Sequence, residues 1–267
     1  MLTSCADVAE RTEAAEALAK AAGYQKLVID TNPFRLLSFE RIRRPGANAV
    51  VYIEGDGLAF TQRNIVSLNP TPVNPVGLKL ALLDDSANVI YLARPCQYIP
   101  VHENPDCHFE FWTTMRYAPE VIQSMNQEID YYKNKYNIGG IRLVGYSGGG
   151  AVGATLAARR KDVIDLRTIA GNLDISAFTR YHKVTPLTGS LNPADYAKEL
   201  STVPQIHFTG TADDIITDSI TGSYLSAIKK YDPGLSCVVL QKVEGASHTR
   251  GWEGVWRQYQ QLKGDCK

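Results

Sequence analysis

The sequence predicts one α/β domain in which helices cover both faces of a mostly parallel sheet. Beyond the first three predicted strands, short apolar runs alternate with longer helical runs, as they do when crossover helices join parallel strands. The chain has 267 residues, and a single domain of this length buries roughly 70–75% of its unfolded surface. No internal repeat or linker interrupts it, so one domain accounts for the pattern.

The composition disfavours two classes of partner. The 28 lysines and arginines balance the 28 aspartates and glutamates, so no long-range field would gather the chain on nucleic acid or on an anionic membrane. No run of 18 or more apolar residues occurs, so we expect no membrane-spanning segment. A small, mostly uncharged substrate fits better, and the sequence does not fix the oligomeric state.

The expected elements start with a helix at Ala6–Ala22, rich in alanine, glutamate and lysine, which ends at Gly23. We therefore separate residues 1–25, an N-terminal segment with this helix, from a main domain at residues 26–267. Eight strands are expected in the main domain, and the first three form an antiparallel entry to the sheet. The strands are Lys26–Asp30, Leu36–Arg43, Ala49–Glu54, Val89–Ala93, Ile141–Val144, Leu166–Ala170, Gln205–Phe208 and Cys237–Val243. The helices are Val76–Leu83, Pro119–Tyr136, Gly149–Arg160, Ser219–Tyr231 and Gly254–Leu262.

Two long stretches break the alternation, and loops of such length are usually functional. Arg94–Ala118 is crowded with aromatic side chains, of which Trp112 could wall an acyl pocket. The second stretch, at about residues 172–200, is interpreted as a short cap insertion. Its candidate lid contacts are Phe178, Tyr181 and Leu187. These aromatic and apolar side chains could equally belong to the core.

The strongest chemical signal is Gly145-Tyr146-Ser147-Gly148-Gly149, which follows an apolar strand and opens a helix of small residues. This is the Gly-x-Ser-x-Gly pattern of a nucleophile elbow, a strained turn that exposes the serine hydroxyl. Small neighbours are needed because strand and helix approach each other closely there. A glycine-rich turn is the structural alternative, but the position between strand and helix favours Ser147 as a nucleophile.

A nucleophilic serine needs a base to accept its proton and an acid to orient that base. Asp213 and Asp214 follow a predicted strand, and His248 precedes the last predicted helix. With the elbow, these runs resemble the α/β-hydrolase superfamily, whose members carry serine, acid and histidine in that order. The resemblance assigns the base to His248 and the acid to Asp213. Asp214 is the adjacent alternative and Asp174 the rival after the sixth strand.

An oxyanion hole would complete the site, since amides must face the carbonyl oxygen as it becomes negative. The resemblance implies Gly148 as the first donor and the main chain of Asp56 as the second, with Gly57 as the alternative. Glu54 stands where the family usually has a histidine, which leaves the hydrogen bonding of this loop open. The Asp56 carboxylate would oppose an oxyanion unless its side chain turns away.

The resemblance extends from about Lys26 to the C-terminus and implies the eight-stranded α/β-hydrolase fold of esterases and lipases, with no cofactor and no metal. It implies acyl transfer through Ser147, and we favour hydrolysis of a small-molecule carboxylic ester. A peptidase, amidase or thioesterase is the alternative, in which Arg116 or Arg180 would bind a charged terminus. A non-catalytic binding protein is less favoured, because the Ser-Asp-His order is intact.

The cysteines suggest a compartment. Met1–Cys5 resembles the end of a bacterial lipoprotein signal, which would make Cys5 a lipidated residue and the protein's only link to a membrane. We then expect a periplasm-facing lipoprotein of the cell envelope or a secreted protein, with a cytoplasmic enzyme as the alternative. The other four cysteines can pair in an oxidising compartment, Cys96 with Cys107 and Cys237 with Cys266. Four reduced thiols are the competing interpretation.

Overall fold

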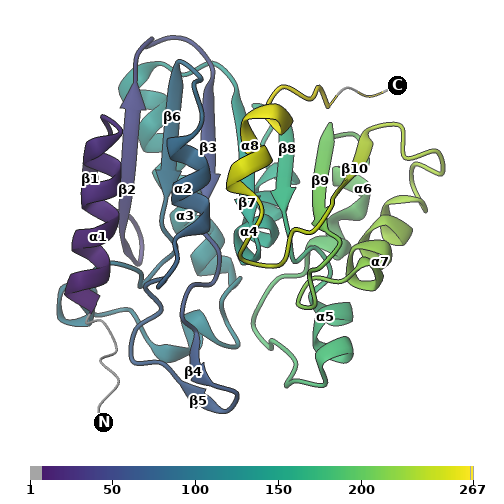
Figure 1. Cartoon of the computed structure of the whole chain (residues 1–267), viewed down its shortest axis with the longest axis horizontal. Coiled ribbons are helices and arrows are strands. Elements are labelled where there is room, and N and C mark those ends of the chain that lie inside the picture. The colour runs from purple at the N-terminus through teal and green to yellow at the C-terminus, as the bar shows by residue number, and fades with distance from the viewer. Residues whose placement is uncertain (1–7, 265, 267) are drawn as a thin grey trace.

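The computed structural model describes residues 8–264 and 266, and an eight-stranded sheet forms its centre (Figure 1). The strand order is β1-β2-β6-β3-β7-β8-β9-β10. β1 pairs with β2 and β2 with β6 in antiparallel fashion, whereas every pair from β6 to β10 is parallel. The predicted mostly parallel sheet is therefore confirmed, and so is the antiparallel pairing of its first two strands. The third predicted strand is not part of the antiparallel entry, because β3 lies between β6 and β7 and pairs in parallel with both. The strands are β1 (Gln25–Asp30), β2 (Arg35–Ile42), β3 (Ala49–Ile53), β6 (Asn88–Leu92), β7 (Ile141–Tyr146), β8 (Val163–Ile169), β9 (Gln205–Gly210) and β10 (Val238–Val243).

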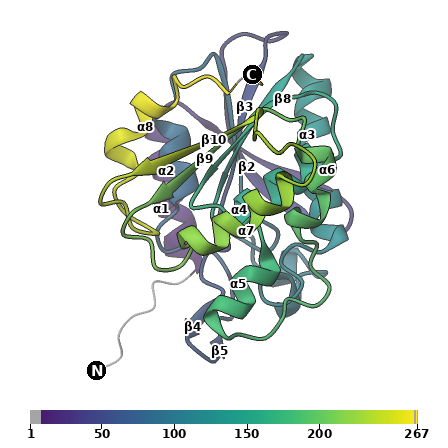
Figure 2. The ribbon, with the colours of Figure 1, turned by 90° about the vertical axis from the view of Figure 1, so that its right-hand side faces the viewer.

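Helices cover the sheet on both faces (Figure 2). The face with α1, α2 and α8 and the face with α3, α4 and α7 each hold one hydrophobic core. β3 shows why both faces are apolar: Val51 and Ile53 enter one core, while Val50 and Tyr52 enter the other. Successive side chains of a strand point to opposite faces, so a strand buried on both sides must be apolar throughout. The helices are α1 (Val8–Ala21), α2 (Val76–Leu82), α3 (Pro119–Tyr136), α4 (Gly148–Ala157), α7 (Asp218–Ile228) and α8 (Glu253–Tyr259).

Several short elements were not expected from the sequence. A two-stranded hairpin, β4 (Phe60–Gln62) with β5 (Ile65–Val66), follows β3. Residues 172–200 contain helices α5 (Ile175–His182) and α6 (Ala197–Leu200) and the 3-10 turn η3 (Pro193–Tyr196), and the aromatic stretch contains η1 (Val101–Glu103) and η2 (Phe109–Trp112). The hairpin of β4 and β5 and helix α5 lie at the lower edge of the sheet in Figure 1.

Two disulfides tie peripheral segments to the domain, and both predicted pairings are present. Cys96 is bonded to Cys107 inside the aromatic stretch, with a Cα–Cα distance of 5.5 Å. Cys237, which precedes β10, is bonded to Cys266 near the C-terminus. Cys5 lies outside the described residues. Across residues 8–264 and 266, no helix combines the length and apolar character that crossing a membrane requires.

One histidine is buried in the sheet without solvent contact. His207 on β9 places Nδ1 2.8 Å from Thr168 Oγ1 and Nε2 3.1 Å from Gln205 Oε1. Its ring also meets the edge of Tyr224 at 5.4 Å between centroids. Burial lowers the pKa of His207 to about 3, so this imidazole is neutral in the folded protein at neutral and mildly acidic pH.

The buried imidazole makes stability depend on pH. Between about pH 6.5 and about 3, the unfolded chain binds a proton at residue 207 that the folded protein does not. The neutral imidazole therefore contributes fully to the free energy of unfolding above the pKa that His207 has in the unfolded chain. This contribution is lost as the pH falls, by up to about 1.4 kcal/mol per pH unit. Urea unfolding of the wild type and His207→Gln between about pH 7 and 4 measures how the free energy of unfolding depends on pH. We expect this free energy to fall less steeply with pH in His207→Gln than in the wild type. His182→Gln, which changes a partly exposed histidine, is the control. Equal slopes for wild type and His207→Gln would contradict the assignment.

The first disulfide should contribute measurably to stability. For cysteines 11 residues apart, the chain-entropy model gives about 3 kcal/mol. We expect Cys96→Ser to lower Tm by about 6–12 °C in a chain of this size. Calorimetry of variant and wild type measures the change, and mass spectrometry of non-reduced peptides identifies the bond. Free thiols at Cys96 and Cys107 in protein purified from its native host would refute the pairing.

Candidate active site

Ser147 stands in a strained turn between β7 and α4. Its φ of 51° and ψ of −118° lie where residues with a side chain rarely fall. A Cβ at Gly145 would come within 2.3 Å of the Gly149 carbonyl oxygen, and one at Gly149 within 2.2 Å of the Ile53 carbonyl oxygen. Only glycine fits at either position, so these two residues let α4 pack directly on β7 and β3.

Ser147, His248 and Asp213 form a chain of hydrogen bonds. Ser147 Oγ lies 3.0 Å from His248 Nε2, and His248 Nδ1 lies 3.0 Å from Asp213 Oδ2. The three residues follow β7, β10 and β9, and the carboxyl ends of parallel strands meet at one edge of a sheet. The arrangement fits a neutral imidazole that donates from Nδ1 to the carboxylate and accepts the serine proton at Nε2.

Of the three candidate acids, the structure brings only Asp213 to the imidazole. Its side chain is fully buried, and Oδ1 accepts hydrogen bonds from the amides of Ile215 (2.8 Å) and Ile216 (2.9 Å). Asp214 is exposed. Asp174 is engaged elsewhere, because it caps α5 at the Ala177 amide and accepts a hydrogen bond from Ser223.

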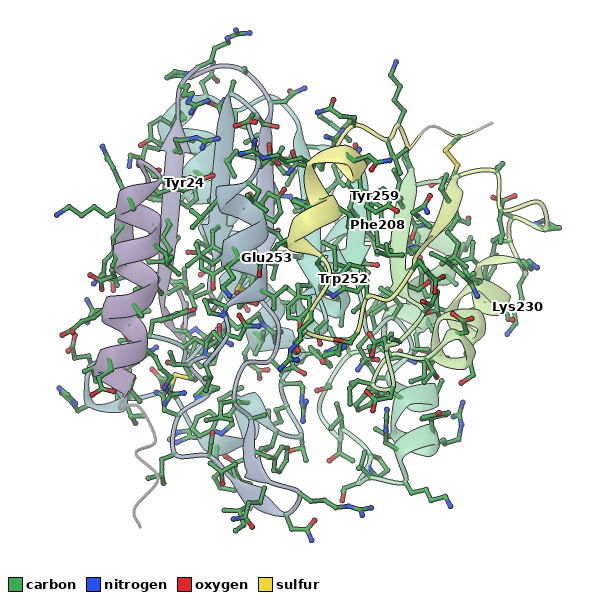
Figure 3. All side chains as sticks on the ribbon, viewed as in Figure 1. Tyr24, Phe208, Lys230, Trp252, Glu253 and Tyr259 are labelled. Carbon is green, nitrogen blue, oxygen red and sulfur yellow. A yellow bond between two sulfur atoms is a disulfide. The ribbon has the colours of Figure 1, made fainter. Side chains whose placement is uncertain are left out.

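The backbone of the histidine loop is held by two aromatic residues that the sequence did not single out. The Tyr146 hydroxyl and the Trp252 indole N–H donate to the His248 carbonyl oxygen at 3.0 and 3.1 Å. Trp252 precedes the first turn of α8 (Figure 3). The Tyr146 ring also lies 5.6 Å from the imidazole, between centroids. The variable position of the Gly-x-Ser-x-Gly motif therefore helps to fix the base.

The predicted oxyanion donors belong to two segments that contact each other, the loop after β3 and the start of α4. Within residues 8–264, the amides of Asp56, Gly57 and Gly148 have no hydrogen-bond partner. The Asp56 side chain lies against Gly148, since its Oδ1 would be only 1.9 Å from a Cβ there. Gly57 has a φ of +66°, and a Cβ there would meet the Pro70 carbonyl oxygen. Its backbone is thus fixed by a different neighbour.

Glu54 organises the loop that carries Asp56. Its buried carboxylate accepts hydrogen bonds from the amides of Gly55, Gly77 and Leu78 at 2.9–3.1 Å. The Tyr91 hydroxyl donates a fourth, at 3.1 Å. Burial raises the pKa of Glu54, although these hydrogen bonds favour its charged form. The glutamate that departs from the family pattern therefore anchors the loop to the start of α2.

The Asp56 carboxylate is paired with cations. It accepts hydrogen bonds from Arg94 (3.3 Å), Arg116 (2.8 Å) and the Tyr117 hydroxyl (2.9 Å). Burial alone would raise the pKa of Asp56, but the positive charges of Arg116 and Arg94 outweigh it and hold that pKa below its ordinary value. The negative charge beside the oxyanion donors is thus compensated.

The candidate lid and pocket residues fall into two groups. Trp112 is buried in the core, with its indole N–H donating to the Ser67 carbonyl oxygen, and Leu187 packs against the same core. Phe178 and Tyr181 lie on α5, where both rings contact His182. In the described part of the chain, no three His, Cys, Asp or Glu side chains are grouped as metal ligands would be.

Comparison with solved structures establishes the α/β-hydrolase fold. An alpha-beta serine hydrolase homologue from Coxiella burnetii aligns over 89% of this chain and 94% of that chain, with 15% identity and a TM-score of 0.59. The esterase Pf2001 from Pyrococcus furiosus aligns over 90% of both chains, with 13% identity and a TM-score of 0.63. Est1E from Butyrivibrio proteoclasticus, with ferulic acid bound, aligns over 88% and 97%, with 12% identity and a TM-score of 0.60. No protein-family model and no curated protein sequence matches the chain.

The geometry predicts unequal roles for the three acids. We expect Asp213→Asn to slow fluorophosphonate labelling of Ser147 by a factor on the order of 10³–10⁴, because an amide cannot hold the same imidazole tautomer. Asp214→Asn and Asp174→Asn are matched controls and should label within a few-fold of the wild-type rate. Labelling kinetics followed by intact mass provide the measurement. Loss of labelling in Asp174→Asn with normal labelling in Asp213→Asn would overturn the assignment.

Proposed function

We propose that the protein hydrolyses a carboxylic ester in two acyl-transfer steps on Ser147. The observation that carries the proposal is the hydrogen-bond chain from Ser147 through His248 to Asp213, with both distances at 3.0 Å. It occurs on a strained turn that presents the hydroxyl. The amides of Gly148 and Asp56, which have no hydrogen-bond partner in the described part of the chain, support it. The proposal therefore assigns a residue to each role, from nucleophile, base and acid to the two oxyanion donors.

The mechanism follows from these positions. Ser147 Oγ attacks the ester carbonyl carbon as His248 Nε2 takes its proton, and Asp213 stabilises the imidazolium. The carbonyl oxygen becomes negative and accepts hydrogen bonds from the amides of Gly148 and Asp56. The intermediate collapses as His248 protonates the leaving alcohol, which leaves an acyl group on Ser147. Water, deprotonated by His248, then attacks the acyl carbon and releases the carboxylic acid.

An ester is favoured over an amide because one of the two candidate arginines is already engaged. Arg116 already donates to Asp56 and to the Thr113 carbonyl oxygen, so it is not a free site for a charged peptide terminus. Arg180 is exposed on α5. A thioester or amide on the same three residues remains the alternative. Matched acyl esters, thioesters and amides of increasing chain length separate these activities and define the acyl pocket.

We further propose that the protein works in the bacterial cell envelope or outside the cell. The two disulfides support this, because such bonds persist in oxidising compartments. A cytoplasmic location is the alternative. Fractionation of the native host with an antibody to the protein distinguishes the two, and intact mass of the purified protein tests for lipid on Cys5.

Replacement of the nucleophile provides the direct test. We expect Ser147→Ala to lower kcat by a factor on the order of 10⁵–10⁶ without changing Tm by more than a few degrees, because only the hydroxyl is lost. Fluorophosphonate labelling should disappear in this variant and persist in Ser226→Ala, which changes an exposed serine on α7. Retained turnover or retained labelling in Ser147→Ala would contradict the assignment of Ser147 as the nucleophile.

A further inference from the structure

Four side chains form a cluster at the carboxyl end of β3, which we call the Asp56 cluster: Asp56, Arg94, Arg116 and Tyr117. Each of the other three donates to the Asp56 carboxylate, at 3.3, 2.8 and 2.9 Å respectively. Arg94 also donates to the Arg116 carbonyl oxygen, and its guanidinium lies 5.3 Å from the Tyr117 ring centroid. These contacts join the loop after β3 to both ends of the stretch between β6 and α3.

The cluster touches both predicted oxyanion donors. A Cβ on Gly148 would meet Asp56 Oδ1 at 1.9 Å and the Tyr117 hydroxyl at 2.8 Å. The carboxylate thus lies against the Cα of one donor residue, while its own main chain supplies the other donor. Both carboxylate oxygens of Asp56 are held by the cluster, so its members also restrain the loop whose amide is the predicted second donor.

The cluster also carries an unbalanced positive charge. Among the described ion pairs, Arg94 and Arg116 share a single carboxylate, that of Asp56. The two arginine side chains are only 5% and 12% exposed. Within residues 8–264 and 266, Arg94 Nε is buried without a hydrogen-bond partner. A buried, unmatched cation is unfavourable in the resting protein and becomes favourable when an anion forms beside it.

We propose that the Asp56 cluster is part of the oxyanion machinery. Its carboxylate holds the Asp56 amide beside Gly148, and the excess charge of Arg94 and Arg116 is matched only when the carbonyl oxygen becomes negative. Arg94, Arg116 and Tyr117 hold the Asp56 carboxylate and are therefore positioning residues, and the two arginines also supply the excess charge. This inference rests on the proposed ester hydrolysis and goes beyond it, since neither the serine motif nor the three hydrogen-bonded residues require such a cluster.

The proposal predicts that replacing Arg116 destabilises the transition state of the reaction and leaves substrate binding nearly unchanged. Arg116→Met should lower kcat about 10- to 100-fold and change KM less than about 3-fold, because the oxyanion is absent from the ground state. Arg116→Lys keeps the charge without the planar fork and should recover part of the loss. The matched control is Arg160→Met, which removes an arginine with a 9% exposed side chain that pairs with Asp130 and Asp162 elsewhere in the fold. Rates are expressed per Ser147 titrated to completion with a fluorophosphonate.

The Ki of a boronic acid inhibitor is a second measurement, and partial misfolding of a variant does not change it. Ser147 Oγ adds to the boron atom and gives a tetrahedral, negatively charged adduct that resembles the intermediate. Across the Arg116 variants, Ki for the inhibitor should rise by the same factor by which kcat/KM falls. A role limited to folding would reduce the titratable Ser147 and leave Ki of the remaining sites unchanged.

Three outcomes separate the alternatives. Parallel changes in Ki and kcat/KM support the proposal. A rise in KM alone, or an unchanged Ki, overturns it and makes Arg116 a substrate contact or a structural residue. If Arg116→Met does not fold, Tyr117→Phe decides, with an expected loss of about 3- to 10-fold in kcat and the same rise in Ki. An unlabelled, inactive wild type would instead refute the proposed hydrolysis itself.

Discussion

The site depends on how closely α4 approaches the backbones of β7 and β3. Gly145 and Gly149 allow this contact, and the contact in turn holds Ser147 at a positive φ that an isolated turn would not keep. Strained residues persist only where surrounding packing leaves them no alternative. The same packing fixes Gly148, the first residue of α4, which directly follows Ser147. The close packing of α4 on β7 and β3 therefore positions both the nucleophile and the first predicted oxyanion donor.

Parallel pairing then assembles the remaining groups. Ile53 on β3 pairs with Gly145 on β7, so the loop with Asp56 begins level with the turn at Ser147. β9 and β10 pair in parallel beside β8, and their loops supply Asp213 and His248. Residues almost 200 positions apart in the chain thus meet because their strands end at one edge. The register of the sheet is therefore the main factor that brings these site residues together.

The assembly of the site from loops at strand ends explains which of its parts the sequence could predict. The strands and the serine, acid and histidine loops are local patterns, and each was recognisable from the residues around it. The roles of Glu54 and the Asp56 carboxylate were not, because their partners come from distant segments: Gly77 and Tyr91 for one, Arg94 and Arg116 for the other. The β4–β5 hairpin was also missed, since strands of two or three residues carry no period that can be read from a sequence.

The disulfide between Cys237 and Cys266 has a consequence for a cleaved chain. The two cysteines are 29 positions apart, and they close a covalent ring that contains β10, His248 and α8. Arg250 is exposed within that ring, where a trypsin-like protease can reach it. A single cut there opens the ring without releasing a fragment, because the sulfur bridge still joins the two pieces. A nicked molecule therefore keeps α8 and Trp252 joined to the piece that carries Ser147 and His248 until a reductant releases them.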